Sequence, residues 1–93
     1  MKVGDIILTF STSFAALDWE NYCEKMAIGG RMIPLPPAIS GSCGLCWKCT
    51  REDIKTNPIP SDRVEKVYEL QHTSPEIWRR CDEKLVSIAD SGD

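Results

Sequence analysis

The chain has 93 residues, 42% of them hydrophobic, which suits one small domain with a single core. Its 11 Lys and Arg residues against 14 Asp and Glu residues give a net charge of −3, and no basic run is longer than Arg79-Arg80, so a nucleic-acid-binding surface is not expected. The apolar run Ile6-Ile7-Leu8 is too short for a signal-peptide core or a membrane span, so we expect a cytoplasmic protein without membrane contact. The five cysteines are then expected to be reduced thiols, catalytic groups or metal ligands, and not a disulfide framework.

The first part of the chain predicts a strand, a helix and a second strand. Val3 to Phe10 is nearly continuously apolar, as in a strand that is buried on both faces. Ser11-Thr12-Ser13 offers hydroxyl caps for a helix whose apolar residues recur at helical spacing, and Gly29-Gly30 is expected to end that helix. Arg31 to Leu35 is a short strand closed by prolines. A strand, a helix and a strand at this spacing predict a βαβ or split βαβ unit.

The second part of the chain is less regular. After the loop from Ala38 to Gly44, Leu45 to Thr50 predicts a third strand, and Arg51 to Asn57 predicts a short helix that ends before a proline. Ser61 to Gln71 fits a helix or a strand, and we predict a strand because the third strand otherwise lacks a partner. Ser74-Pro75-Glu76 has the hydroxyl cap, first-turn proline and acid of a helix start, so a helix is predicted from Ser74 to about Asp90.

The stretch from Ser40 to Thr50 carries the candidate chemistry, because it holds Cys43, Cys46 and Cys49. Cys43 lies in a Gly- and Ser-rich loop, where another protein's active site could approach its thiol closely. This placement predicts a nucleophile or carrier thiol at Cys43, and Cys46 is its candidate helper in releasing the cargo through a transient disulfide. The residues expected to give access to the thiol or to bind its cargo are Ser40, Gly41, Ser42 and Gly44.

Metal and redox interpretations of the same cysteines stay open. Cys43, Cys46 and Cys49 have the Cys-x-x-Cys-x-x-Cys spacing of ferredoxin-type iron–sulfur ligands, and Cys23 or Cys81 would supply a fourth ligand. In a strand, however, Cys46 and Cys49 would point to opposite faces of the sheet. A redox disulfide between Cys43 and Cys46 needs a turn, because an extended chain separates their α-carbons by ~10 Å. A structural zinc site would need a further pair of ligands at suitable spacing.

The cysteines also fit a purely structural interpretation. Cys46 and Cys49 have the size and position of small packed strand residues. Cys23 and Cys81 fall on the apolar faces of predicted helices, where core packing is the expected role.

Several short motifs, in this order and at this spacing, resemble those of a known family. They are Phe10-Ser11-Thr12-Ser13, Ala16 with Glu20, Ile33-Pro34-Leu35-Pro36, Ile39-Ser40 and Cys43-Gly44-Leu45. Over about residues 3 to 50 the chain is similar to the selenium/sulfur carrier-like family. That resemblance implies a small two-layer α+β fold and a Cys43 thiol that holds sulfur or selenium as a persulfide or selenopersulfide. Cys46 and Cys49 depart from the family pattern.

The elements and the resemblance together predict an α+β fold, a small two-layer βαββ(α)β sandwich that is ferredoxin-like or sulfur-carrier-like, with an added C-terminal helix. We expect a carrier-like domain over residues 1–71 and a helical extension over residues 72–93 that packs on the domain or on a partner. The expected function is that of a carrier or accessory protein, not an enzyme, which holds a chalcogen atom without a cofactor and exchanges it with a protein donor and a protein acceptor. The alternative is a small iron–sulfur or metal-binding subunit of a larger redox complex, with Cys43, Cys46 and Cys49 as ligands.

Overall fold

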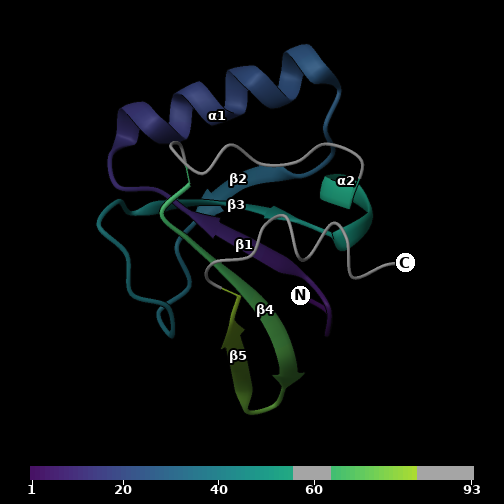
Figure 1. Ribbon diagram of the computed structural model, residues 1–93. Coiled ribbons are helices and arrows are strands. Elements are labelled where there is room, and N and C mark those ends of the chain that lie inside the picture. Colours follow the sequence, from purple (N-terminus) through teal and green to yellow (C-terminus); the bar gives the residue numbers. More distant parts are fainter. Residues whose placement is uncertain (56–63, 82–93) are drawn as a thin grey trace.

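A computed structural model describes residues 1–55 and 64–81 of the chain, and it shows a single curved sheet with a long helix across one face (Figure 1). The elements in chain order are β1 (Ile6–Thr9), α1 (Ser13–Met26), β2 (Arg31–Pro34), β3 (Leu45–Cys49), α2 (Arg51–Lys55), β4 (Lys66–Thr73) and β5 (Glu76–Arg80).

The sheet has the strand order β2-β3-β1-β4-β5, and all neighbouring strands are antiparallel. Because β1 and β2 are both antiparallel to β3, which lies between them, they run parallel to each other and are joined by α1. This arrangement confirms the predicted split βαβ unit and the α+β class. The central strand β1 is completely buried along its length, as its continuous apolar run predicted.

Helix α1 begins where the sequence indicated and ends earlier. Thr12 is its N-cap, and the Ala15 amide donates to Thr12 Oγ1 at 3.0 Å. The predicted end at Gly29-Gly30 is wrong, because Ala27 already adopts the left-handed conformation, with φ at 57°, and closes the helix. Gly30 makes the turn into β2 instead: its φ is 118°, and a side chain there would collide with the ring of Trp47.

Each face of the sheet has its own hydrophobic cluster, as the alternation of side chains along the strands requires. The face beneath α1 is filled by a large cluster that includes Ile6, Leu8, Phe10, Trp19, Cys23, Trp47, Cys49 and Val67. The opposite face carries a smaller cluster of Ile7, Ile39 and Cys46, with Leu35, Tyr68 and Trp78 packed around it. The proline-rich loop after β2 supplies Leu35 and Ile39, so within residues 1–55 and 64–81 it is this loop, and not α1, that packs on the opposite face.

The C-terminal part of the described chain differs from its prediction. In place of a helix starting at Ser74, Glu76–Arg80 forms strand β5, which pairs with β4 in a hairpin that projects from the sheet (Figure 1). Ser74 and Pro75 lie in the turn of this hairpin, which uses the same residue types as a helix start. Strand β4 extends to Thr73 and leads directly into this turn. The remainder of the predicted helix, residues 82–90, lies outside the described residues.

Candidate functional site

Cys43 lies in the loop immediately before β3, and its side chain turns inward toward the start of α1. The sulfur receives a hydrogen bond from the Leu45 amide at 3.4 Å, and Ser13 Oγ lies 4.0 Å from it. Cys43 is only 6% exposed and belongs to the cluster beneath α1, so the expected solvent-exposed thiol is not observed. The flanking residues Ser42 and Gly44 are exposed, because only the side chain of residue 43 packs inward.

Ser13 is a sulfur neighbour that the sequence analysis missed. The strand register explains its position: Thr9 of β1 pairs with Cys46 of β3. Continuing this antiparallel register past both strand ends brings the first residues of α1 beside residue 43. The thiol therefore faces the N-terminal end of a capped 14-residue helix, where peptide dipoles favour negative charge.

The predicted cargo-binding loop surrounds the thiol only in part. Ser42 Oγ donates to Glu65 Oε2 at 3.0 Å, so its hydroxyl is directed away from the sulfur, and Ser40 is exposed. Gly41 is exposed but leaves little room for a side chain, since an added Cβ would meet Leu35 at 3.2 Å. Gly44 borders open space, because a side chain at this position would meet no heavy atom within 4 Å. The open side of the loop is thus next to Cys43, at Gly44.

The other strand cysteines are buried thiols on two different faces. Cys46 belongs to the small cluster and donates weakly to the Pro34 carbonyl at 3.8 Å, whereas Cys49 belongs to the cluster beneath α1. This placement agrees with the expected alternation along β3. Burial raises the pKa of Cys46 to about 11, with a further contribution from the nearby Cys43. Burial also raises the pKa of Cys49 well above its usual value, helped by the charge of Asp53.

Cys43, Cys46 and Cys49 do not converge on a common point, because Cys46 points to the opposite face of the sheet from the other two. In residues 1–55 and 64–81 no group of three or more His, Cys, Asp or Glu side chains is arranged to hold a metal ion. Cys23 is 1% exposed, and burial, followed by the charges of Asp53 and Glu20, raises its pKa to about 12. Cys23, Cys46 and Cys49 are therefore separate buried thiols, and each packs in one of the two hydrophobic clusters.

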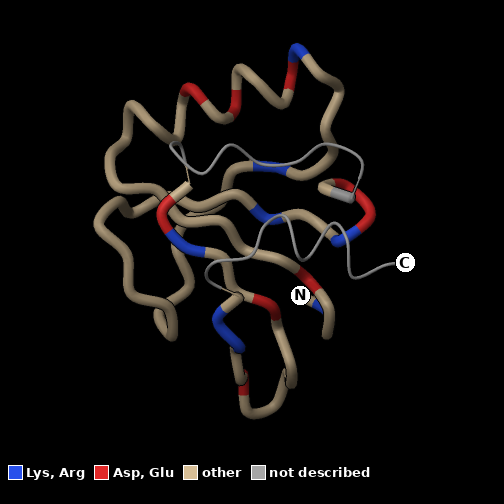
Figure 2. The backbone as a smooth tube through the Cα atoms, in the orientation of Figure 1, with Lys and Arg blue, Asp and Glu red and all other residues tan. Residues whose placement is uncertain are grey.

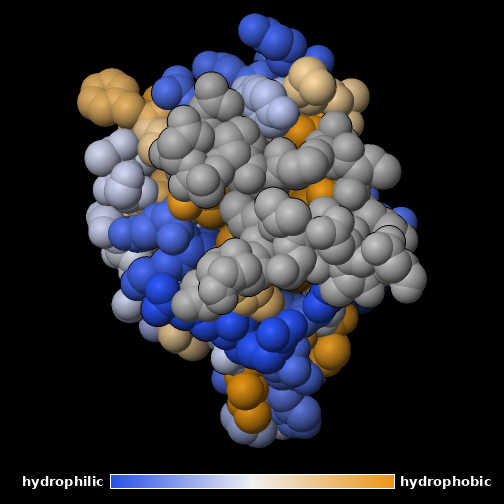
Figure 3. Space-filling model, in the orientation of Figure 1, coloured by the Kyte–Doolittle hydropathy of each residue, from blue (hydrophilic) through white to orange (hydrophobic). Residues whose placement is uncertain are grey.

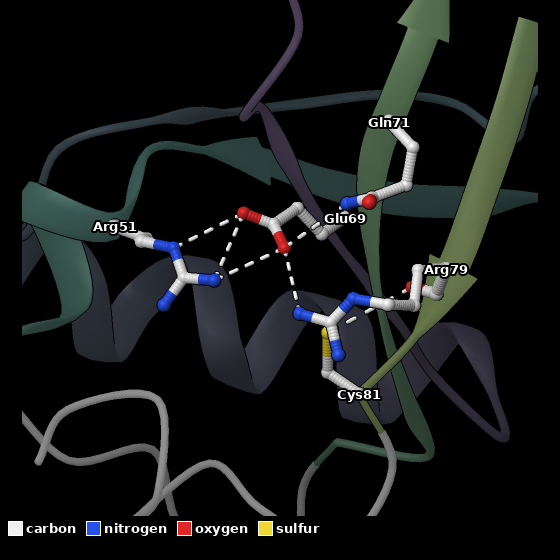
Figure 4. A network of polar contacts seen from close by, with 5 residues as sticks. All are labelled: Arg51, Glu69, Gln71, Arg79 and Cys81. Carbon is white, nitrogen blue, oxygen red and sulfur yellow. Dashed lines mark hydrogen bonds and ion pairs between the residues drawn. The ribbon is translucent and has the colours of Figure 1, made fainter. Parts of the chain in front are cut away.

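A buried carboxylate outside the thiol region holds the projecting hairpin to the rest of the fold (Figure 4). Glu69 of β4 accepts hydrogen bonds from Arg51 Nε at 3.0 Å and Arg79 Nη2 at 2.8 Å, which join it to α2 and β5. Gln71 Nε2 also donates to it, at 3.2 Å. Burial alone would raise the pKa of Glu69, but the hydrogen bonds and charges of Arg79 and Arg51 outweigh burial and lower it.

The surface near Cys43 includes hydrophobic side chains on the first turns of α1. Phe14, the neighbour of Ser13, is 81% exposed and Leu17 is 49% exposed, and hydrophobic groups protrude at this end of α1 in the space-filling view (Figure 3). Exposed hydrophobic side chains beside a functional group are typical of protein contact surfaces. Within the described ranges, no helix has the length and apolar character needed to cross a membrane.

The chain was compared with known families, curated proteins and solved structures. A family model described as "Putative Se/S carrier protein-like" matches residues 5–57, which is more than half of the chain. The match runs from β1 through α2 and includes Cys43 with its sulfur neighbours, and it leaves out β4 and β5. No curated protein and no solved structure matches the chain.

Proposed function

Because the chain belongs to the Se/S carrier protein-like family, we propose that it carries a sulfur or selenium atom on the Cys43 thiol and hands it from a donor protein to an acceptor protein. The observation that carries this assignment is the polar environment of the Cys43 sulfur. It combines the Leu45 amide at 3.4 Å, the Ser13 hydroxyl at 4.0 Å and the N-terminal end of α1. Backbone amides, hydroxyls and helix N-termini are the groups with which proteins commonly bind a sulfur atom or an anion.

The proposed transfer needs no external oxidant. The Cys43 thiolate attacks the terminal sulfur of a donor cysteine persulfide, and a new S–S bond forms while the donor's own S–S bond breaks. The bonding electron pair leaves with the donor cysteine as a thiolate, so the total oxidation state is unchanged. An acceptor thiol then attacks the terminal sulfur on Cys43 in the same way and restores the Cys43 thiolate. Selenium would follow the same route as a selenopersulfide.

Cys43 differs in its surroundings from the other four cysteines, all of which the structure describes. Cys23, Cys46 and Cys49 have pKa values raised first by burial, and this favours the unreactive neutral thiol. Cys81 directly follows β5 and packs in the cluster beneath α1. The release role predicted for Cys46 requires it to reach Cys43 from the opposite face of the sheet, and our proposal therefore assigns the transfer to Cys43 alone.

Access to the buried sulfur is proposed to come from its own loop. Ser42 and Gly44 are exposed on both sides of Cys43, and the space beside Gly44 is open. A change in the Cys43 side-chain rotamer with a small movement of this loop would present the sulfur to a docked partner, with Phe14 and Leu17 exposed nearby as contacts. The buried state would then shield the loaded atom from solvent thiols between transfers.

The proposal is tested by loading the protein under anaerobic conditions. The full chain is incubated with a cysteine desulfurase and L-cysteine, or with a selenocysteine lyase and selenocysteine, and then measured as intact protein by mass spectrometry. The wild type should gain the mass of one sulfur or one selenium atom, and a peptide map should place it on Cys43.

Three single substitutions provide the controls. Cys43→Ser should abolish the adduct, whereas Cys46→Ser and Cys49→Ser, which remove neighbouring buried thiols, should retain it. An adduct of equal yield on Cys43→Ser, or no adduct on the wild type with either donor system, contradicts the proposed function.

A further inference from the structure

A second site of different chemistry lies at the far end of α1 from its capped start. A cleft of about 380 Å³ opens between the last turns of α1 and strands β2 and β3. This volume is at the lower end of the range for small-molecule pockets, so the cleft suits a metabolite and not a peptide or a dinucleotide. It does not involve Cys43 or its sulfur neighbours.

The cleft is lined by charges of both signs. Glu20 and Glu24 lie one turn apart on α1, and Arg31 is the first residue of β2 across from them. Figure 2 shows acidic positions along α1 and a basic position on β2 beneath the helix. Among the described residues, none of these three side chains forms an ion pair within 4.0 Å, although all three border the same cleft. The opposite charges that border the cleft are therefore not joined to each other by a direct ion pair.

The floor of the cleft is formed by buried apolar and sulfur-containing side chains. Trp47 is 5% exposed, its indole nitrogen donates to the Gly29 carbonyl at 3.3 Å, and its ring packs edge-on against Trp19. Cys23 contributes a neutral buried thiol and Met32 a thioether, which is polarisable and adapts its shape. This combination favours an unbranched apolar or sulfur-containing side chain.

From these features we propose that the cleft binds a free α-amino acid with an apolar, methionine-like side chain. The ammonium group would lie between Glu20 and Glu24, the carboxylate would pair with the Arg31 guanidinium, and the side chain would lie over Trp47 and Met32. A zwitterion satisfies both signs of charge at once, whereas an anion or a cation alone would satisfy only one. The proposal is independent of the carrier function of Cys43.

Binding is measured by titrating the full-length ¹⁵N-labelled protein with L-methionine and recording amide and indole chemical shifts. We expect saturable shifts confined to the end of α1, the start of β2 and the Trp47 indole. Acetate, methylamine and N-acetyl-L-methioninamide, which each lack one or both charges, should give no saturable shifts at these positions.

Substitutions then test the two charged contacts separately. Glu20→Gln and Arg31→Gln should each weaken L-methionine binding by about tenfold, the typical effect of losing one charge-assisted hydrogen bond. Asp18→Asn removes the same charge from the same helix outside the cleft and should leave the affinity unchanged. The dispersion of the spectra shows whether each variant is folded. The proposal is overturned if L-methionine gives no saturable shifts, if the uncharged amide binds as well, or if both cleft variants bind like the wild type.

Discussion

Glu69 gives the sharpest test of how this fold is held together. Glu69 is 8% exposed, and its carboxylate accepts three hydrogen bonds from guanidinium groups, two from Arg51 at 3.0 Å and one from Arg79 at 2.8 Å. Glu69→Gln keeps the shape of the side chain and removes its charge. The side chains of Arg51 and Arg79 are 40% and 52% exposed, so water recovers part of what they lose. We therefore expect the free energy of unfolding to fall by about 2 kcal/mol, more than for an exposed pair and less than for a fully buried one.

The pH dependence of this loss separates an electrostatic contribution from simple packing. The pKa of Glu69 in the folded protein is lowered from 4.5, so its stabilising contribution is complete above that value and is lost as the pH falls through the lower folded pKa. Urea unfolding followed by tryptophan fluorescence should show the full difference between wild type and Glu69→Gln at about pH 7 and a much smaller difference at about pH 3. Glu65→Gln, at an exposed carboxylate with one hydrogen bond to Ser42, should change stability by less than about 0.5 kcal/mol. An equal loss for Glu69→Gln at both pH values would refute the reasoning.

Two further predictions concern the glycines and the buried thiols. Gly30→Ala should lower the free energy of unfolding, measured in urea, by about 2–3 kcal/mol, because the φ of residue 30 is 118° and the new methyl group would collide with Trp47. Gly44→Ala is the control: its methyl group would meet no heavy atom within 4 Å, so the free energy of unfolding should change by less than about 0.5 kcal/mol. Similar losses for the two variants would contradict this interpretation. The pKa values of Cys23 and Cys46 are raised to about 12 and about 11, so both thiols are mostly neutral at about pH 8. Iodoacetamide should therefore alkylate them slowly in the native protein at about pH 8 and faster toward about pH 10. Rapid labelling of either cysteine at about pH 8, mapped by mass spectrometry, would contradict the burial and the raised pKa of that thiol.

The local part of the fold could be predicted from the sequence because its causes are local. The hydroxyl run Ser11-Thr12-Ser13 and the helical spacing after it predicted α1, and the opposite orientations of Cys46 and Cys49 follow from strand alternation alone. The end of α1 could not be predicted, because a left-handed alanine at Ala27 leaves no mark in the residue pattern, while Gly29-Gly30 offers a misleading one.

The C-terminal hairpin shows why contacts between distant segments cannot be predicted from local sequence patterns. A serine, a proline and an acid in succession suit a helix start and a turn equally well, and the choice depends on what lies opposite. Here Arg79 lies directly across from Glu69 on the neighbouring strand, and that cross-strand ion pair supports β5. Arg51, which completes the network, comes from α2, far from both in sequence. No pattern within one segment contains this information.

The position of the Cys43 thiol depends on both its local sequence and contacts with distant segments, and its burial bears on how a carrier of this kind would work. The Gly- and Ser-rich loop predicted an accessible thiol at Cys43, whereas the side chain packs inward, because the pairing of β1 with β3 brings the start of α1 beside it. If the proposed function holds, a permanently exposed persulfide would exchange with any thiol in solution, whereas one held against the Leu45 amide and the Ser13 hydroxyl would be protected until the loop moved. Transfer would then depend on a docked partner. The inward orientation of Cys43, which at first argues against a carrier, is the arrangement that would restrict delivery to the correct acceptor.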